Sequence, residues 1–138
     1  MPFPDHDLMT GGHARTIVWG DVYWFDFTLL HSNQYTFGGP HPAVVVSFPS
    51  RVHGPLVTLL PLTGAENALD DYPMHVAVPR SACPNLDKDS VAKCDQLYTV
   101  DSEYLIDEHY ICRLSVDALR PIFEQLINFL NFRAFHPQ

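Results

Sequence analysis

The fold class of this chain is indicated first by the stretch Gly38-Gly39-Pro40-His41-Pro42-Ala43-Val44-Val45-Val46-Ser47. Glycine and proline at its start predict a turn, and the β-branched residues that follow are typical of a strand. Residues Ala43–Phe48 are apolar at consecutive positions. We therefore expect a strand buried on both faces, which requires other parts of the protein on both sides of the sheet.

A second informative stretch is Lys93-Cys94-Asp95-Gln96-Leu97-Tyr98-Thr99-Val100-Asp101. We predict one polar-apolar strand over Ser90–Thr99, in which Asp95 and Gln96 would point to opposite faces. The Gln96 amide offers both a donor and an acceptor, which suits the Watson–Crick edge of an unpaired base. The alternative interpretation is a buried side chain whose hydrogen bonds go to the backbone.

The remaining pattern predicts several short strands and one helix. The strands are expected over residues 17–27, 56–62, 74–79 and 109–114, and the helix over residues 115–130. Ser115 is a plausible N-cap, whereas Pro121 would fit the first turn of a helix that begins near Leu119. Short, regularly spaced strands followed by a helix favour a mainly β fold, a small and strongly bent β-barrel.

The composition indicates one domain: the chain has 138 residues, 46% of them hydrophobic, enough for a single core. We expect a flexible leader over residues 1–16, the folded domain over 17–133 and a short tail over 134–138. No apolar run approaches the roughly 20 residues of a membrane span, and the N-terminus does not have the pattern of a secretory signal. We expect no membrane partner.

Three cysteines, an odd number without any CxxC pair, argue against a disulfide framework and against a zinc knuckle. A cytoplasmic protein is therefore expected. The eight histidines form no HxH or HExxH arrangement, and no glycine-rich phosphate loop precedes a helix. These patterns predict no metal site and no cofactor.

The formal net charge of −8, with only eight basic residues, disfavours tight, non-specific binding of nucleic acid. A local field in a cleft can nevertheless oppose the net charge of the whole protein. A small, specific site for nucleic acid is compatible with this composition.

Together with Gly20-Asp21-Val22-Tyr23-Trp24 and Leu60-Pro61-Leu62-Thr63, the two stretches resemble the MazF/PemK/Kid family of toxin endoribonucleases. The resemblance extends from about Gly20 to Leu130. It implies an SH3-like barrel of the CcdB/Kid type with a C-terminal helix, assembled as a homodimer. It also implies cleavage of single-stranded RNA by attack of the 2′-OH without a metal ion, and inhibition by a cognate antitoxin peptide.

The family usually places Arg immediately before the second proline of the first stretch, where this chain has His41. Metal-free RNA cleavage needs proton transfer and donors around the phosphate. Histidine, with an unperturbed pKa near 6.5, is a competent acid or base but a weaker permanent cation than arginine. Either His41 replaces the arginine, or the site has decayed. The family places a phosphate-binding threonine in this Pro-x-Thr context, so the resemblance implies that role for Thr63; a local strand-end cap is the alternative.

The resemblance also implies a set of RNA-facing residues: Ser47, His75, Lys88, Asp95, Gln96 and Tyr98. Tyr98 stands where the family has a basic residue, and its ring could stack on a base instead. For Lys88 the alternative is a solvated loop charge, and for His75 a structural strand histidine.

Two other functions stay open at this point. The loss of both expected basic residues, together with the net charge of −8, is compatible with a non-catalytic binding protein that kept the barrel. A gyrase poison of the CcdB type shares the fold, and Phe132-Arg133-Ala134-Phe135 is a faint hint of its aromatic C-terminus.

Overall fold

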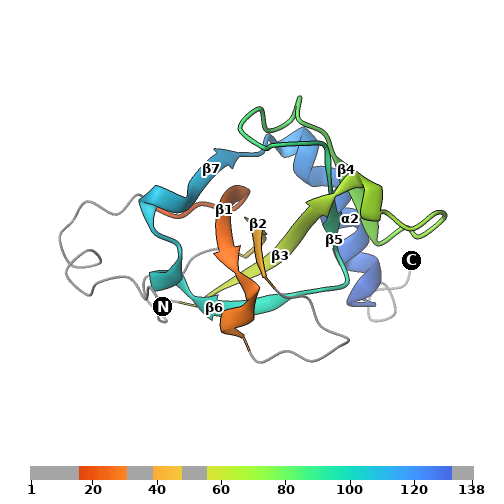
Figure 1. Cartoon of the computed structure of the whole chain (residues 1–138). Coiled ribbons are helices and arrows are strands. Elements are labelled where there is room, and N and C mark those ends of the chain that lie inside the picture. The colour runs from red at the N-terminus through yellow and green to blue at the C-terminus, as the bar shows by residue number, and fades with distance from the viewer. Residues whose placement is uncertain (1–15, 31–38, 48–55, 132–138) are drawn as a thin grey trace.

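The computed structural model describes residues 16–30, 39–47 and 56–131 (Figure 1). The predicted leader, apart from Thr16, lies outside these residues. So do the tail and the C-terminal aromatic residues from Phe132 onward. The domain boundaries at 17 and 133 therefore stay predictions.

Strands dominate the described part of the chain and form one curled antiparallel sheet (Figure 1). The strands are β1 (Asp21–Asp26), β2 (Pro40–Val45), β3 (Leu56–Gly64), β4 (His75–Val78), β5 (Ser90–Lys93), β6 (Tyr98–Asp101) and β7 (Tyr110–Arg113). Single 3-10 turns lie at Phe27–Leu29, Ala65–Asn67, Ser102–Tyr104 and Asp107–His109, and helix α2 spans Val116–Phe129. The strand order is β4-β5-β3-β2-β1-β7, and β6 pairs with β3.

Strand β3 is the centre of the sheet because it carries partners along its whole length. Its first half pairs with β6, from Leu56↔Asp101 to Leu59↔Tyr98, and its last residues pair with β5. The other edge of β3 pairs with β2. The long strand therefore bends between two sets of neighbours, which gives the sheet its curled shape.

The sheet is buried on both faces, as the apolar run of β2 predicts. Ala43 and Val45 belong to one cluster of buried residues, together with Val57 and Leu59 of β3. Val44 belongs to a second cluster, which also contains Leu60 and Leu62 of β3 and Leu119, Ile122 and Leu126 of α2. Alternate residues of each strand thus enter two different cores.

Helix α2 covers the second of these cores and begins at Val116. The hydroxyl of Ser115 accepts a hydrogen bond from the Ala118 N–H at 3.2 Å, so Ser115 is the N-cap. Pro121 lies inside the helix on its exposed face, where water can reach the Asp117 carbonyl that lacks a partner N–H. No helix within the described residues has the length and apolar character needed to cross a membrane.

The prediction of one strand over Ser90–Thr99 is wrong, because the chain turns between β5 and β6. The Gln96 N–H donates to the Lys93 carbonyl at 3.1 Å and closes the turn. Both strands pair with β3, at its opposite ends, so the connecting residues must leave the ladder. Asp95 and Gln96 are turn residues, not strand residues.

The cysteine count argued against a disulfide framework, but it did not foresee the single bridge that joins Cys83 and Cys112. Cys83 lies in the connection between β4 and β5, and Cys112 lies on β7; the fold brings them together across 29 residues of sequence. An odd count excludes complete pairing but not one bridge. Cys94 is free and buried, and its burial, followed by the neighbouring Asp95 charge, raises the pKa of its thiol to about 12.

Candidate active site

His41 and Thr63 come from neighbouring strands, β2 and β3. The pairing of β2 with β3 ends at Ala43↔Pro61, and each of the two residues lies two positions beyond that pair. Both residues line one cavity of about 280 Å³.

The backbone around His41 is stiff. Gly39 has a φ of +86°, which a glycine adopts without strain. Pro40 and Pro42 fix their own φ angles, and each restricts the residue before it. The imidazole is therefore presented from a backbone with little freedom, at the start of a strand paired with β1 through Phe25↔His41.

One wall of the cavity comes from the 3-10 turn after β3, the loop before β5 and the first residue of β5. The turn contributes Asn67, the loop contributes Leu86, Asp87 and Lys88, and β5 contributes Ser90; Trp24 of β1 also lines the cavity. Trp24 is 38% exposed. The cavity thus combines an imidazole, a hydroxyl, an ammonium and an indole ring.

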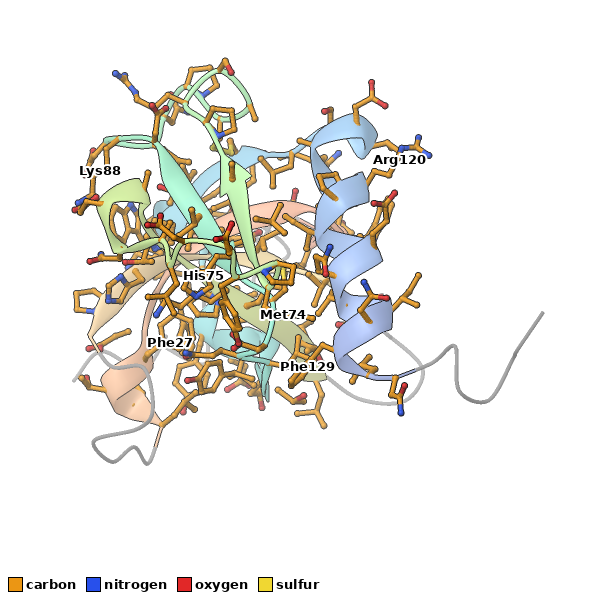
Figure 2. All side chains as sticks on the ribbon, turned by 90° about the vertical axis from the view of Figure 1, so that its right-hand side faces the viewer. Phe27, Met74, His75, Lys88, Arg120 and Phe129 are labelled. Atoms are coloured by element: carbon orange, nitrogen blue, oxygen red, sulfur yellow. A yellow bond between two sulfur atoms is a disulfide. The ribbon has the colours of Figure 1, made fainter. Side chains whose placement is uncertain are left out.

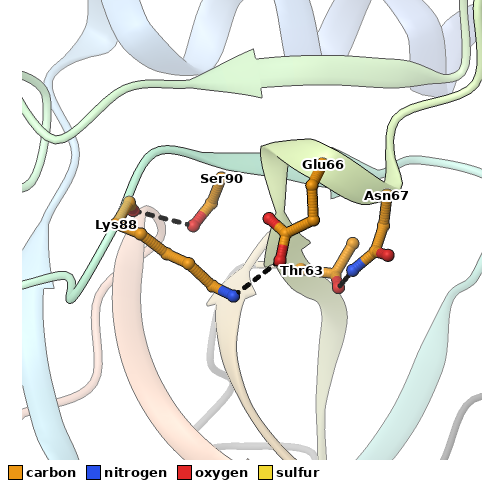
Figure 3. A network of polar contacts seen from close by, with 5 residues as sticks. All are labelled: Thr63, Glu66, Asn67, Lys88 and Ser90. Atoms are coloured by element: carbon orange, nitrogen blue, oxygen red, sulfur yellow. Dashed lines mark hydrogen bonds and ion pairs between the residues drawn. The ribbon is translucent and has the colours of Figure 1, made fainter.

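Three hydrogen bonds fix this wall (Figure 3). The Asn67 Nδ2 donates to the Thr63 hydroxyl oxygen at 2.9 Å. The Lys88 Nζ donates to the Glu66 carboxylate at 2.9 Å, and this bond holds the pKa of Glu66 below its ordinary value. The Ser90 hydroxyl donates to the Lys88 carbonyl at 3.2 Å. The hydroxyl and the cation of the cavity are therefore held by neighbours rather than freely rotating.

An aromatic path leads from His41 to Gln96. The ring centroid of Phe27 lies 6.4 Å from that of His41 and 5.0 Å from that of Tyr98. The Tyr98 hydroxyl donates to the Gln96 Oε1 at 3.3 Å. The buried Phe27 ring thus separates Tyr98 and Gln96 from His41, and neither Tyr98 nor Gln96 lines the cavity.

His75 and Asp95 form a third group with Tyr72. The Tyr72 hydroxyl donates to Asp95, which raises the pKa of Tyr72. The Tyr72 and His75 rings meet edge to face at 4.9 Å. The Leu69 N–H donates to the His75 Nδ1 at 3.1 Å. Figure 2 shows Lys88 and Phe27 on the side of the molecule away from α2, with His75 between them and the helix.

Burial lowers the pKa of His75, and the nearby Lys93 charge lowers it further, while Asp95 acts in the opposite direction. A neutral His75 agrees with the hydrogen bond that its Nδ1 accepts. His75 therefore has a structural bond in addition to its place near the predicted RNA-facing residues.

Ser47 is separated from the other predicted site residues. Its hydroxyl accepts a hydrogen bond from the Thr58 N–H at 2.8 Å. It lines a different, apolar pocket beside Leu97 and Leu126. The geometry thus brings His41, Thr63 and Lys88 to one cavity, connects Gln96 and Tyr98 to His41 only through the buried Phe27, and leaves Ser47 elsewhere.

Sequence reasoning missed two residues that shape the cavity, Glu66 and Asn67. Both lie in the 3-10 turn Ala65–Asn67, directly after the strand that ends in Thr63 and Gly64. Their proximity to Thr63 along the chain was a usable signal. Their roles depend on how the turn folds back over the cavity, which the residue pattern alone does not specify.

Comparisons with known proteins agree with this geometry. Residues 19–130 match the family described as the PemK-like, MazF-like toxin of type II toxin-antitoxin systems. No curated protein is similar enough to match. Among solved structures, MazF from Deinococcus radiodurans has a TM-score of 0.66 at 22% identity, covering 85% of this chain and 98% of that one.

A mycobacterial endoribonuclease in complex with its cognate antitoxin has a TM-score of 0.62 at 24% identity, covering 84% and 96% of the two chains. These similarities confirm the predicted mainly β fold, a curled half-barrel sheet with a C-terminal helix. The family match covers nearly all of the described residues, including every strand and α2. The chain belongs to the PemK-like, MazF-like toxin family of type II toxin–antitoxin systems.

Proposed function

We propose that this toxin is an endoribonuclease that cleaves single-stranded RNA without a metal ion. The observation that carries the proposal is the shared cavity of His41 and Thr63, two side chains from neighbouring strands. Proton transfer and stabilisation of charge on phosphorus are the two requirements of RNA transesterification. An imidazole and a hydroxyl meet these two requirements in one place.

In the proposed reaction, the 2′-oxygen attacks the adjacent phosphorus and the bond from phosphorus to the 5′-oxygen breaks. The products are a 2′,3′-cyclic phosphate and a free 5′-OH. His41 transfers a proton as acid or base, and Thr63 donates its hydroxyl proton to a non-bridging phosphate oxygen. Lys88, on the rim of the cavity, contributes positive charge next to the phosphate.

The aromatic path beyond His41 would hold the base that flanks the scissile phosphate. A ring such as Tyr98 stacks on a base, and Gln96 offers a donor and an acceptor to its edge. His75 and Asp95 form a separate group with Tyr72.

The partners of this chain are part of the proposal. We infer a homodimer that a cognate antitoxin peptide inhibits. The toxin–antitoxin family match and the mycobacterial relative solved with its antitoxin support this inference. We place the toxin in the cytoplasm, where messenger RNA is translated. The Cys83–Cys112 disulfide is the observation that argues against this location, because cytosolic thiols are usually kept reduced.

A second candidate function, a non-catalytic binding protein of the same fold, is favoured by one specific observation. The Lys88 ammonium is already paired with Glu66 at 2.9 Å, and the chain carries a net charge of −8. Positive charge for an RNA backbone is therefore scarce at this site.

The test of the proposed function is incubation of the purified protein with a long, unstructured RNA in EDTA, from about pH 5 to pH 8. We expect cuts that persist in EDTA and leave cyclic-phosphate and 5′-OH ends. A folded protein that cuts no RNA at any pH, yet still binds it, would contradict the proposal and support the non-catalytic binder.

A further inference from the structure

We propose that Asn67 is a positioning residue that aims the Thr63 hydroxyl proton into the cavity. This inference rests on the proposed function, because it assigns how the phosphate-binding hydroxyl is prepared. Asn67 and Thr63 both line the cavity, and the Asn67 Nδ2 lies 2.9 Å from the Thr63 Oγ1.

The direction of this hydrogen bond decides what Thr63 can do. A hydroxyl has one proton to donate and two lone pairs that accept. Because the Asn67 amide donates, it occupies a lone pair and leaves the proton of Thr63 available. A non-bridging oxygen of an RNA phosphodiester is only an acceptor, so it can bind Thr63 only through that proton. An acceptor at position 67 would capture the proton instead.

The position of Asn67 is fixed by the backbone around it. Asn67 ends the 3-10 turn that follows β3. The Ala65 N–H donates to the Asp89 carbonyl at 3.0 Å, and the Ala68 N–H donates to the Ala65 carbonyl at 3.1 Å. The turn is thereby bonded to the loop that carries Lys88. Thr63 is itself only 7% exposed, so the protein rather than bulk water sets the orientation of its hydroxyl.

A donor that is oriented before the substrate arrives stabilises developing charge more effectively than one that must reorient. Asn67 thus contributes to the reaction without touching the reacting atoms. It distinguishes this site from one in which a threonine alone contacts the phosphate. Figure 3 shows the pair together with Glu66 and Lys88.

The test compares Asn67→Asp with Asn67→Ala. Asp has nearly the shape of Asn but accepts a hydrogen bond, so it captures the Thr63 proton. Ala leaves the proton free but no longer aims it. We expect kcat/KM for RNA cleavage to fall about 100-fold in Asn67→Asp, comparable to the loss of one oxyanion donor, and clearly less in Asn67→Ala. Repulsion between the new carboxylate and the phosphate would also make Asp worse than Ala, so the same change made in Thr63→Val decides between the two causes.

Asn128→Asp is the matched control, since it introduces the same charge on the exposed surface of α2. Thr63→Val removes the hydroxyl while keeping the shape. Once Thr63 is Val, the further change Asn67→Asp should cost little, because both changes remove the same donor. Thermal unfolding of each variant checks that the fold is kept.

A second readout separates this inference from the proposed function. Inorganic phosphate is titrated while the NMR signal of the Thr63 γ-methyl group is followed. We expect Asn67→Asp to weaken phosphate binding at least about tenfold relative to Asn128→Asp, whether or not RNA is cleaved. The inference is overturned if Asn67→Asp keeps the wild-type affinity for phosphate, or if phosphate does not shift this signal in the wild type. It is also overturned if the loss of kcat/KM caused by Asn67→Asp adds fully to the loss caused by Thr63→Val.

Discussion

The Lys88 ammonium lies 2.9 Å from the Glu66 carboxylate, on the wall of the cavity that His41 and Thr63 share. Gly64 makes room for this pair, because a Cβ at that position would lie 2.1 Å from the Glu66 Oε1. The protein therefore places its own anion on the cation that would bind a phosphate. Under the proposed function, Glu66 would compete with an RNA phosphate for Lys88.

Replacing this internal competitor should strengthen RNA binding. We expect Glu66→Gln to lower KM for RNA about two- to fivefold at low salt, since both side chains of the pair are exposed and such pairs are weak. The gain should shrink as salt is raised, because mobile ions screen the same charges. The measurement is KM for cleavage at low and high salt.

Glu124→Gln provides the control, because it removes the same charge from α2 rather than from the cavity that Lys88 lines. Equal effects of the two substitutions at low salt would mean that only net charge matters. In that case Glu66 would not compete for Lys88.

His75 should make the fold sensitive to mild acid. Burial first, and Lys93 second, hold its folded-state pKa below the ordinary value. Its neutral form therefore contributes stability that is complete above about pH 6.5, the unfolded value, and is lost as the pH falls through the lower folded value. Protonation also ends the bond that Nδ1 accepts from the Leu69 N–H.

The measurement is urea unfolding at about pH 7.5 and pH 5.5 for the wild type and His75→Asn. The Asn side-chain oxygen can accept the Leu69 hydrogen bond but does not titrate. The wild type should lose more free energy of unfolding between these pH values than the variant. An identical loss in both proteins would show that other groups cause the acid sensitivity.

The disulfide should be a main contributor to stability. It closes a loop of 29 residues between Cys83 and Cys112, and a bridge of this kind typically contributes about 2–4 kcal/mol. We expect Cys112→Ser to lower the free energy of unfolding by that amount under non-reducing conditions. The wild type in thiol reductant should match the variant.

Mass spectrometry of the alkylated protein, without reduction, checks the pairing directly. One alkylated cysteine after unfolding is the expected result, because Cys94 is free. Three alkylated cysteines in protein taken from cells would show that the bridge is absent there.

The sequence was sufficient to predict the family and to select candidate site residues where the local residue pattern and the family resemblance agreed. The turn before β2 and the Pro-x-Thr context of β3 singled out His41 and Thr63 as candidates, and both residues line one cavity. The family model matched residues 19–130, which confirms the recognition made from these segments. That His41 replaces the family's arginine in the reaction stays a prediction.

The errors have a common physical origin, in contacts between residues distant in sequence. Asp95 and Gln96 sit in a turn because β5 and β6 each pair with a different part of β3. The local alternation of polar and apolar residues could not reveal that the two strands pair with different parts of β3. The bridge between Cys83 and Cys112 depends in the same way on how the β4–β5 connection lies against β7.

The most direct test of the account is the pH profile of RNA cleavage in EDTA for the wild type, His41→Ala and His41→Arg. Loss of an acid or base should lower the rate of His41→Ala at least about 100-fold. His41→Arg should keep some activity with a flatter profile between about pH 5 and pH 8, because arginine does not titrate there. His109→Ala, which does not line the cavity, should behave like the wild type. His41→Ala that cleaves RNA at the wild-type rate would contradict the central claim.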